Sequence, residues 1–123
     1  MSYVHSGRNP VTLRSDPVDP DSTDEVFFVL DNWLRDDLLE TLTPGSHLAT
    51  AAGATIVTQP RSVGPMVDDD GTTYQHVYAI RFTVTAGAAE VVITYRKSTT
   101  TGGLVNLGRT NHDHTIRIPV KTL

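Results

Sequence analysis

Apolar and polar side chains alternate with a period of two over residues 76–97, and this pattern constrains the fold most. Its first run places five side chains on one face of an extended segment, namely His76, Tyr78, Ile80, Phe82 and Val84. A second run places Ala89, Val91, Ile93 and Tyr95 on one face. Because successive side chains of a strand point to opposite faces, the period predicts two β-strands. The short Ala86-Gly87 connection predicts a β-hairpin between them.

Weaker alternating segments extend this pattern over the rest of the chain. Residues 112–120 repeat it, with His112, His114, Ile116, Ile118 and Val120 on one face, and residues 47–58 predict one strand or a pair broken at Gly53. Asp68 to Gly71 has the composition of a turn, and residues 98–109 that of a polar loop. Strands at this spacing, with Gly, Pro and Asp between them, predict an all-β, antiparallel β-sandwich over residues 25–123.

Residues 26–30 are apolar at consecutive positions, so both faces of this predicted strand are apolar. Val26, Phe28 and Leu30 share one face, and Phe27 and Val29 share the other. Either the strand is buried on both sides within its own fold, or Phe27 and Val29 contact a partner.

The first 24 residues predict an extended arm that precedes the sandwich domain. They hold three prolines and little apolar periodicity, and proline fixes φ and removes a donor. Val11, Leu13 and Val18 are its candidate partner-binding residues; an arm that is disordered in solution is the alternative. Farther along, Leu34, Leu38 and Leu42 recur at helical spacing before Pro44, which predicts at most one short helix or a helical turn.

Composition and charge exclude several classes of function. The chain has no cysteine, which agrees with folding in a reducing cytoplasm, and no apolar segment long enough for a signal peptide or a membrane span. Its net charge is −4, and residues 1–40 hold nine acidic and three basic residues. This balance argues against nucleic acid as a partner, since phosphate binding needs clustered Lys and Arg. Two solvated surfaces of opposite sign are one interpretation, and docking of the acidic segment on a basic face of a neighbouring copy is the other.

The search for chemistry gives no catalytic residue, cofactor or metal site that we retain. His112-x-His114 could bind zinc with His47 or His76, but both also lie on the apolar face of the last predicted strand. Asp68 to Gly71 lacks the ligand spacing of a calcium loop. Ser46 and His47 with an aspartate would supply the residue types of a catalytic triad, but most proteins of this size contain such a set, so it carries little weight. An aromatic platform for sugar would need Tyr3 and Tyr74, while Tyr78 and Tyr95 fall on apolar faces.

The order of several short motifs resembles a family of small immunoglobulin-like proteins encoded in tailed-phage and prophage structural gene clusters. The likeness covers about residues 18–121, while residues 1–17 have no counterpart and the 36–75 region is longer than in the family. The matching segments are Val18-Asp19-Pro20-Asp21, Asn32-Trp33-Leu34, Val92-Ile93-Thr94-Tyr95, Gly108-Arg109-Thr110 and Thr115-Ile116-Arg117-Ile118-Pro119-Val120. The resemblance implies an immunoglobulin-like sandwich and a virion structural protein that is not an enzyme.

The arm, the doubly apolar strand and the uneven charge favour a capsid decoration or cement protein among virion proteins. Such a protein is made in the host cytoplasm and resides in the virion. Its expected partners are other virion proteins, with the major capsid protein favoured, and a homo-oligomer with further copies of itself is a second option. Neither nucleic acid nor a membrane is expected as a partner. A neck, tail or fibre component is the nearest alternative. A carbohydrate-binding or host-adhesion module, using the loops around residues 68–73 and 98–109, is an alternative from another class.

Overall fold

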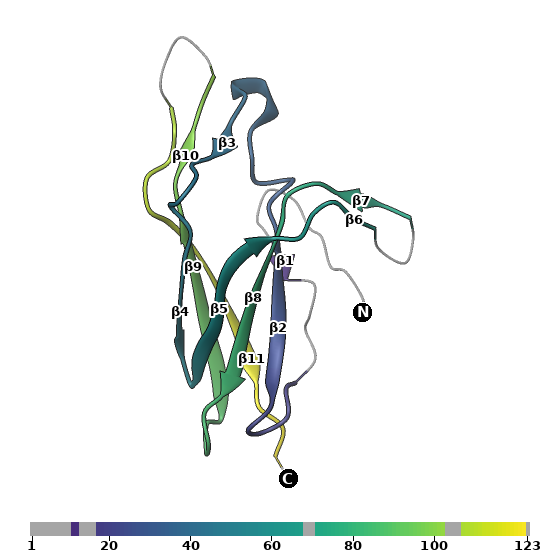
Figure 1. Cartoon of the computed structure of the whole chain (residues 1–123), viewed down its shortest axis with the longest axis vertical. Helices are drawn as coiled ribbons and strands as arrows, with labels where there is room; N and C mark the ends of the chain where they lie inside the picture. Colours follow the sequence, from purple (N-terminus) through teal and green to yellow (C-terminus); the bar gives the residue numbers. More distant parts are fainter. Residues whose placement is uncertain (1–10, 13–16, 68–70, 103–106, 123) are drawn as a thin grey trace.

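The computed structural model describes residues 11–12, 17–67, 71–102 and 107–122. It is an all-β structure with two main antiparallel sheets that lie face to face (Figure 1). One sheet has the order β1-β2-β8-β5, formed by Val11–Thr12, Thr23–Val29, Val77–Val84 and Ala54–Ser62. The other has the order β11-β9-β4, formed by His112–Pro119, Glu90–Lys97 and Leu48–Ala52. Two short pairs complete the structure: β3 (Thr41–Leu42) with β10 (Thr99–Thr100), and β6 (Met66–Val67) with β7 (Thr73–Tyr74).

The main core fills the space between the two sheets, as the alternating pattern predicts. The inner faces of β2 and β8 meet the inner faces of β9 and β11, and Phe28 and Tyr95 contact edge to face at 5.3 Å. Fully or nearly fully buried side chains here include Val26, Phe28, Leu30, Ile80, Phe82, Val84, Val91, Ile93, Tyr95 and Ile118. The predicted β-sandwich is therefore confirmed, while its immunoglobulin-like character stays a prediction.

A second, smaller core lies on the outer face of β2 and β8. Phe27 and Val29 pack there with Tyr74, Val77 and Ala79, and Val63 and Met66 cover them from the β6–β7 side. The sequence left two alternatives for the face of Phe27 and Val29, and the structure confirms burial within the chain's own fold. A segment that is apolar on both faces is thus explained by two separate cores.

The predicted hairpin between residues 76–84 and 88–97 is wrong, because β8 and β9 belong to different sheets. Their connection crosses from one sheet to the other, and so does the connection between β4 and β5 at Gly53. The two turns lie against each other, and the Thr85 amide donates to the Gly53 carbonyl at 2.9 Å. Alternation by itself fixes the faces of a strand, and a two-residue turn is compatible with either connection.

The boundary between arm and domain lies earlier than residue 25. Val18 is buried in the main core, its amide donates to the Pro119 carbonyl at 3.0 Å, and its carbonyl accepts from Lys121 at 2.8 Å. Thr23 already begins β2. Residues 17–24 are therefore part of the folded domain, and β1 pairs with β2 through Val11 with Val29 and Thr12 with Phe28.

The leucine spacing at 34–42 produces a helical turn and no longer helix. Asp36–Leu38 form one turn of 3-10 helix, which ends at Leu39 in the left-handed region with φ of 51°. Leu34 is buried, whereas Leu39 is 66% exposed. The predicted polar loop at 98–109 is also partly regular, since it contains β10, which pairs with β3.

Candidate functional site

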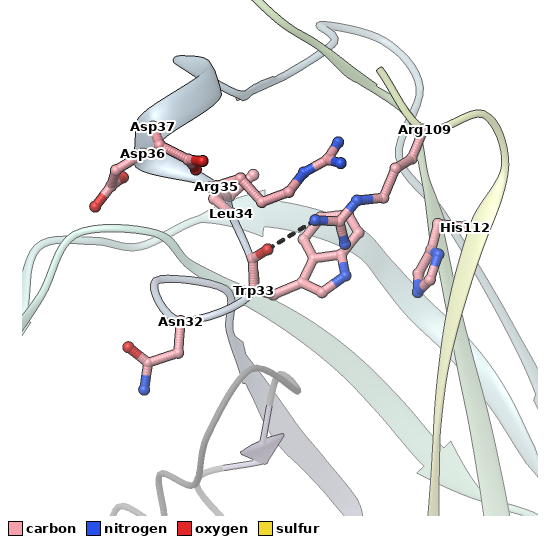
Figure 2. Close-up of a pocket in the computed structure, with 8 residues that line it drawn as sticks. All are labelled: Asn32, Trp33, Leu34, Arg35, Asp36, Asp37, Arg109 and His112. Carbon is pink, nitrogen blue, oxygen red and sulfur yellow. Dashed lines mark hydrogen bonds between the residues drawn. The ribbon is translucent and has the colours of Figure 1, made fainter. Parts of the chain in front are cut away.

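A pocket of about 600 Å³ opens beside Trp33, at the end of the sandwich that carries β3 and β10 (Figure 2). Three parts of the chain form it: the turn after β2, the 3-10 turn, and the residues that lead into β11. Its lining residues are Asn32, Trp33, Leu34, Arg35, Asp36, Asp37, Arg109 and His112. Because these segments are far apart in the sequence, only the fold brings them together.

Trp33 forms the floor of this pocket and is held by a tight turn. The amides of Trp33 and Leu34 both donate to the Leu30 carbonyl at 3.0 Å, directly after β2. The indole is only 5% exposed, and the Arg109 guanidinium lies 4.1 Å from its centroid. The rings of His112 and His114 pack against it at 5.0 and 4.9 Å. A sugar therefore has no free indole face to stack on.

Glu40 is a buried carboxylate that holds the two arginines of the pocket. Arg35 donates to it from the backbone amide and from two guanidinium nitrogens, at 3.0, 3.1 and 2.7 Å. The Arg109 guanidinium donates at 3.0 Å and the Thr99 hydroxyl at 2.6 Å. Burial acts to raise the pKa of Glu40, but the hydrogen bonds from Arg35 and Thr99 outweigh it and lower that pKa to about 2. Glu40 is thus ionised and fully bonded at neutral pH.

Each of the two arginines that line the pocket has one guanidinium nitrogen that the described chain leaves without a hydrogen bond. Nη2 of Arg109 is used twice, by Glu40 and by the Trp33 carbonyl at 2.9 Å, which Figure 2 shows as a dashed line. Nη2 and Nε of Arg35 are used by Glu40 and by the Leu107 carbonyl. Within the described residues, Nη1 of both arginines has no hydrogen-bond partner. Two guanidinium groups held by Glu40 therefore keep N–H donors that no described residue uses.

Lys97 lies behind Trp33 and is completely buried, and no carboxylate of the described residues contacts it. Its ammonium nitrogen donates to the Tyr95 carbonyl at 3.2 Å, contacts Nδ1 of His114, and lies 4.9 Å from the Trp33 centroid. Burial lowers the pKa of Lys97 to about 7. Burial and then the Lys97 charge lower the pKa of His114 to about 3, and the same two causes, followed by Arg109, lower that of His112. Burial is the largest cause in all three groups, and the Arg109 charge also lowers each of the three pKa values.

The outer edge of β11 is a second candidate surface. The Val120 amide donates to the Ala89 carbonyl, on the side of β11 that faces β9. On the opposite, outer side, the Pro119 carbonyl accepts from the Val18 amide and the Lys121 amide donates to the Val18 carbonyl. Since bonding direction alternates along a strand, the backbone groups of Asp113, Thr115 and Arg117 point outward on the same edge. Within the described chain, Val18 is the one residue that pairs with this edge.

The other outer strands of the two sheets are less suited to pairing. β5 has register shifts between Ile56 and Thr58 and between Thr58 and Arg61, which distort its edge. β4 spans five residues, whereas β11 pairs with β9 over eight residues without a shift. Of these three strands, β11 therefore presents the longest regular edge.

The structure does not bring the predicted partner-binding residues together on the surface. Phe27 and Val29 lie in the second core and Val18 in the main core, so their side chains are occupied within the domain. The side chain of Val11 and all of Leu13 lie outside the described residues.

The other sequence candidates do not assemble a reactive centre among the described residues. His112 and His114 lie 4.6 Å apart, but no group of three His, Asp or Glu side chains there could hold a metal ion. Ser46 donates to the Thr43 carbonyl, while His47 contacts the Tyr95 hydroxyl at 2.5 Å. Tyr74 is buried, so it offers no platform for a sugar. Asp68, Asp69, Asp70 and Tyr3 lie outside the described residues.

The sequence prediction gives no site role to Glu40 and Lys97 behind the pocket, or to Arg109 in its lining, which appears only in the Gly108-Arg109-Thr110 segment. One signal was present: period two places Lys97 on the same face as Val91, Ile93 and Tyr95, where a lysine is unusual. No local signal connects Glu40 with Arg109, because they are 69 residues apart and meet through β3 and β10.

Comparison with known proteins gives no relative from which a function could be transferred. No protein-family model matches the chain, and neither curated proteins nor solved structures give a significant match. Within the described residues, no helix is long and apolar enough to cross a membrane.

Proposed function

We propose that this chain is a non-enzymatic structural protein of a tailed-bacteriophage particle that binds neighbouring virion proteins. A capsid decoration role, with the major capsid protein as partner, is the specific form of the proposal. The motif resemblance over about residues 18–121 supports the virion assignment. The observation that carries the binding role is the regular outer edge of β11, on which Val18 is the one described residue that pairs.

Strand addition is the mode of binding that this edge supports. An extended segment of a partner would bond to the outward N–H and C=O groups of Asp113, Thr115 and Arg117, next to the bridge that Val18 makes with Val120. Each such hydrogen bond contributes about 0.5–1.5 kcal/mol net. On the outer face of the sheet, the ion pairs of Arg117 with Glu90 and of Arg96 with Asp113 would flank the added strand. These charged side chains would give the main-chain pairing its specificity.

The virion assignment is tested by quantitative mass spectrometry of purified particles from the source virus or the induced prophage. A decoration protein is expected at hundreds of copies, on the order of the capsid lattice. A count of about three to twelve would place the protein in the neck or tail and overturn the capsid form of the proposal. Absence from the particle would overturn the virion assignment itself.

The binding edge is tested by amide hydrogen exchange of the full chain, free and bound to particles. In the free chain, the outward amides of Thr115 and Arg117 should exchange fast, and binding should slow them. The amides of β8 serve as the control, because this strand is paired on both sides within its own sheet. Protection that appears on another strand and not on β11 would exclude this edge as the binding surface.

A further inference from the structure

The pocket beside Trp33 has two chemically different ends. At one end lie the guanidinium groups of Arg35 and Arg109, and at the other lie the carboxylates of Asp36 and Asp37 on the 3-10 turn (Figure 2). A ligand that fills the pocket therefore needs an anionic group for the first end and hydrogen-bond donors for the second. From this pairing we propose that the pocket binds a sugar acid, a pyranose ring that carries a carboxylate.

The arginine end is built for a carboxylate. Glu40 fixes both guanidinium groups through bonds of 2.7–3.1 Å, while Nη1 of each has no bonding partner in the described chain. Because the positions of these donors are set by a buried residue behind them, they lose little freedom when an anion binds. A carboxylate would bond to them in the fork geometry that guanidinium groups prefer.

The two guanidinium groups at this end carry one positive charge more than the Glu40 carboxylate that they share, which also favours an anion. Arg109 and the half-charged Lys97 lie on the Trp33 ring, and Glu40 is the one buried carboxylate among the described residues that bonds to the two arginines. Asp113 lies on the outer face of the sheet and bonds to Arg96. Burial lowers the pKa of Arg109 and the Arg35 charge lowers it further, against the opposing effect of Glu40. A bound carboxylate would relieve this repulsion.

The aspartate end distinguishes a sugar acid from other anions. Asp36 and Asp37 are exposed, and their carboxylates have no hydrogen-bond partner in the described chain, so they can accept bonds from hydroxyl groups. A ligand that carries negative charge at both ends, such as an aspartate-rich peptide, would be repelled by the same carboxylates. A volume of about 600 Å³ lies within the range of small-ligand pockets and suits a compact ring.

The test uses the full chain and defined probes followed by NMR. The probes are methyl glucuronide and methyl galacturonide, with the matching neutral methyl glycosides, acetate, and an aspartate-rich peptide as comparisons. We expect the sugar acids to shift the Trp33 indole and His112 signals and to bind at least about tenfold tighter than the neutral sugars or acetate. Binding should also raise the pKa of His112, since it adds a negative charge nearby.

Variants separate the two ends of the pocket from general effects. Asp37→Asn should weaken sugar-acid binding several-fold without weakening acetate binding, since the Asp37 charge acts on Arg35, and Arg109→Lys should weaken both. Arg61→Gln, which alters an exposed guanidinium on β5 outside the pocket, should change neither. Equal binding of neutral and acidic sugars, stronger binding of the acidic peptide at the same residues, or no shift of Trp33 and His112 would each overturn the proposal. Because β11 is not altered, pocket variants should still attach to particles, so this test is independent of the proposed function.

Discussion

At the scale of single residues, the Glu40 carboxylate accepts bonds from Arg35, Arg109 and Thr99 while its side chain is fully buried. The Glu40→Gln variant would leave two guanidinium groups without their counter-charge. Because both are partly exposed, with 34% and 22% of their side chains accessible, water moderates the loss. We expect a decrease of about 3 kcal/mol in the free energy of unfolding, measured by urea denaturation.

The control for Glu40 is an ion pair of similar length on the surface. Arg117 contacts Glu90 at 2.8 Å, with 68% and 48% of the two side chains exposed. Arg117→Gln should change the free energy of unfolding by no more than about 0.5 kcal/mol. Equal losses in the two variants would show that Glu40 acts only as one more surface charge.

Lys97 makes stability depend on pH in a defined window. Its pKa in the folded chain is lowered to about 7 from 10.5, so between these values the unfolded chain holds a proton that the folded chain has released. Stability should therefore rise with pH in this window, by about 2 kcal/mol between pH 7 and pH 9. The measurement stops at pH 9 because burial raises the pKa of Tyr95 and Tyr78, and ionisation of tyrosine in the unfolded chain would act in the opposite direction.

The Lys97→Met variant tests this assignment directly. It keeps an unbranched side chain of similar length in the core but removes the titrating amine, so the rise between pH 7 and pH 9 should flatten. Lys121→Met, which removes a lysine whose side chain is 52% exposed, should keep the rise. Thermal unfolding at the two pH values measures both, and a rise that persists in Lys97→Met would assign it to another group.

At the scale of elements, the sequence predicts where strands lie better than how they are connected. The faces of β2, β8, β9 and β11 follow from alternation, because burial of one face imposes the period. The hairpin at residues 86–87 could not be distinguished from a crossing between sheets, since Ile80 and Phe82 reach the same core as Val91 and Ile93 in either arrangement. The second core was equally hidden, because its cover comes from Val63, Met66 and Tyr74 in short strands without a clear period.

The crossing turns depend on a close approach at Gly53, which gives a prediction for this element. Gly53 has φ of 76°, and a Cβ atom there would lie 2.2 Å from the Glu90 carbonyl oxygen. Gly53→Ala should therefore combine backbone strain with a clash against main chain and lower the free energy of unfolding by about 2–4 kcal/mol. Gly87 has φ of 79° with no atom near its Cβ position, so Gly87→Ala should lower it by about 1 kcal/mol only. Thermal denaturation of the pair isolates the clash.

At the scale of the whole molecule, the sandwich is closed by the segment that the sequence assigns to an arm. Three prolines and weak periodicity predict an extended conformation for residues 1–24, and Val18 is indeed extended where it bridges β11. A single buried valine between prolines carries no periodic signal, so its place in the main core could not be predicted. The candidate site could not be predicted either, because the Glu40–Arg109 contact exists only after β3 pairs with β10.

Truncation from the N-terminus should therefore show a sharp step at Val18. Removing residues 1–16 takes away β1, which pairs with β2 at two positions, and should lower the free energy of unfolding by about 1–2 kcal/mol. Removing residues 1–22 also takes away the buried Val18 side chain and its two backbone bonds to β11, for a total loss of about 4–6 kcal/mol. Such a loss is comparable to the whole stability of a small domain, so the longer truncation should be largely unfolded at 37 °C.

Circular dichroism and urea denaturation of the two truncated chains measure this step. Experiments on binding should use no truncation longer than the shorter one, because it removes residues 1–16 but keeps the bridge of Val18 with Val120. If the truncation of residues 1–22 unfolds at the same urea concentration as that of residues 1–16, Val18 does not stabilise the sandwich and the domain begins at β2. If both truncated chains are unfolded, the two pairs of β1 with β2 contribute far more than two ladder positions ordinarily do.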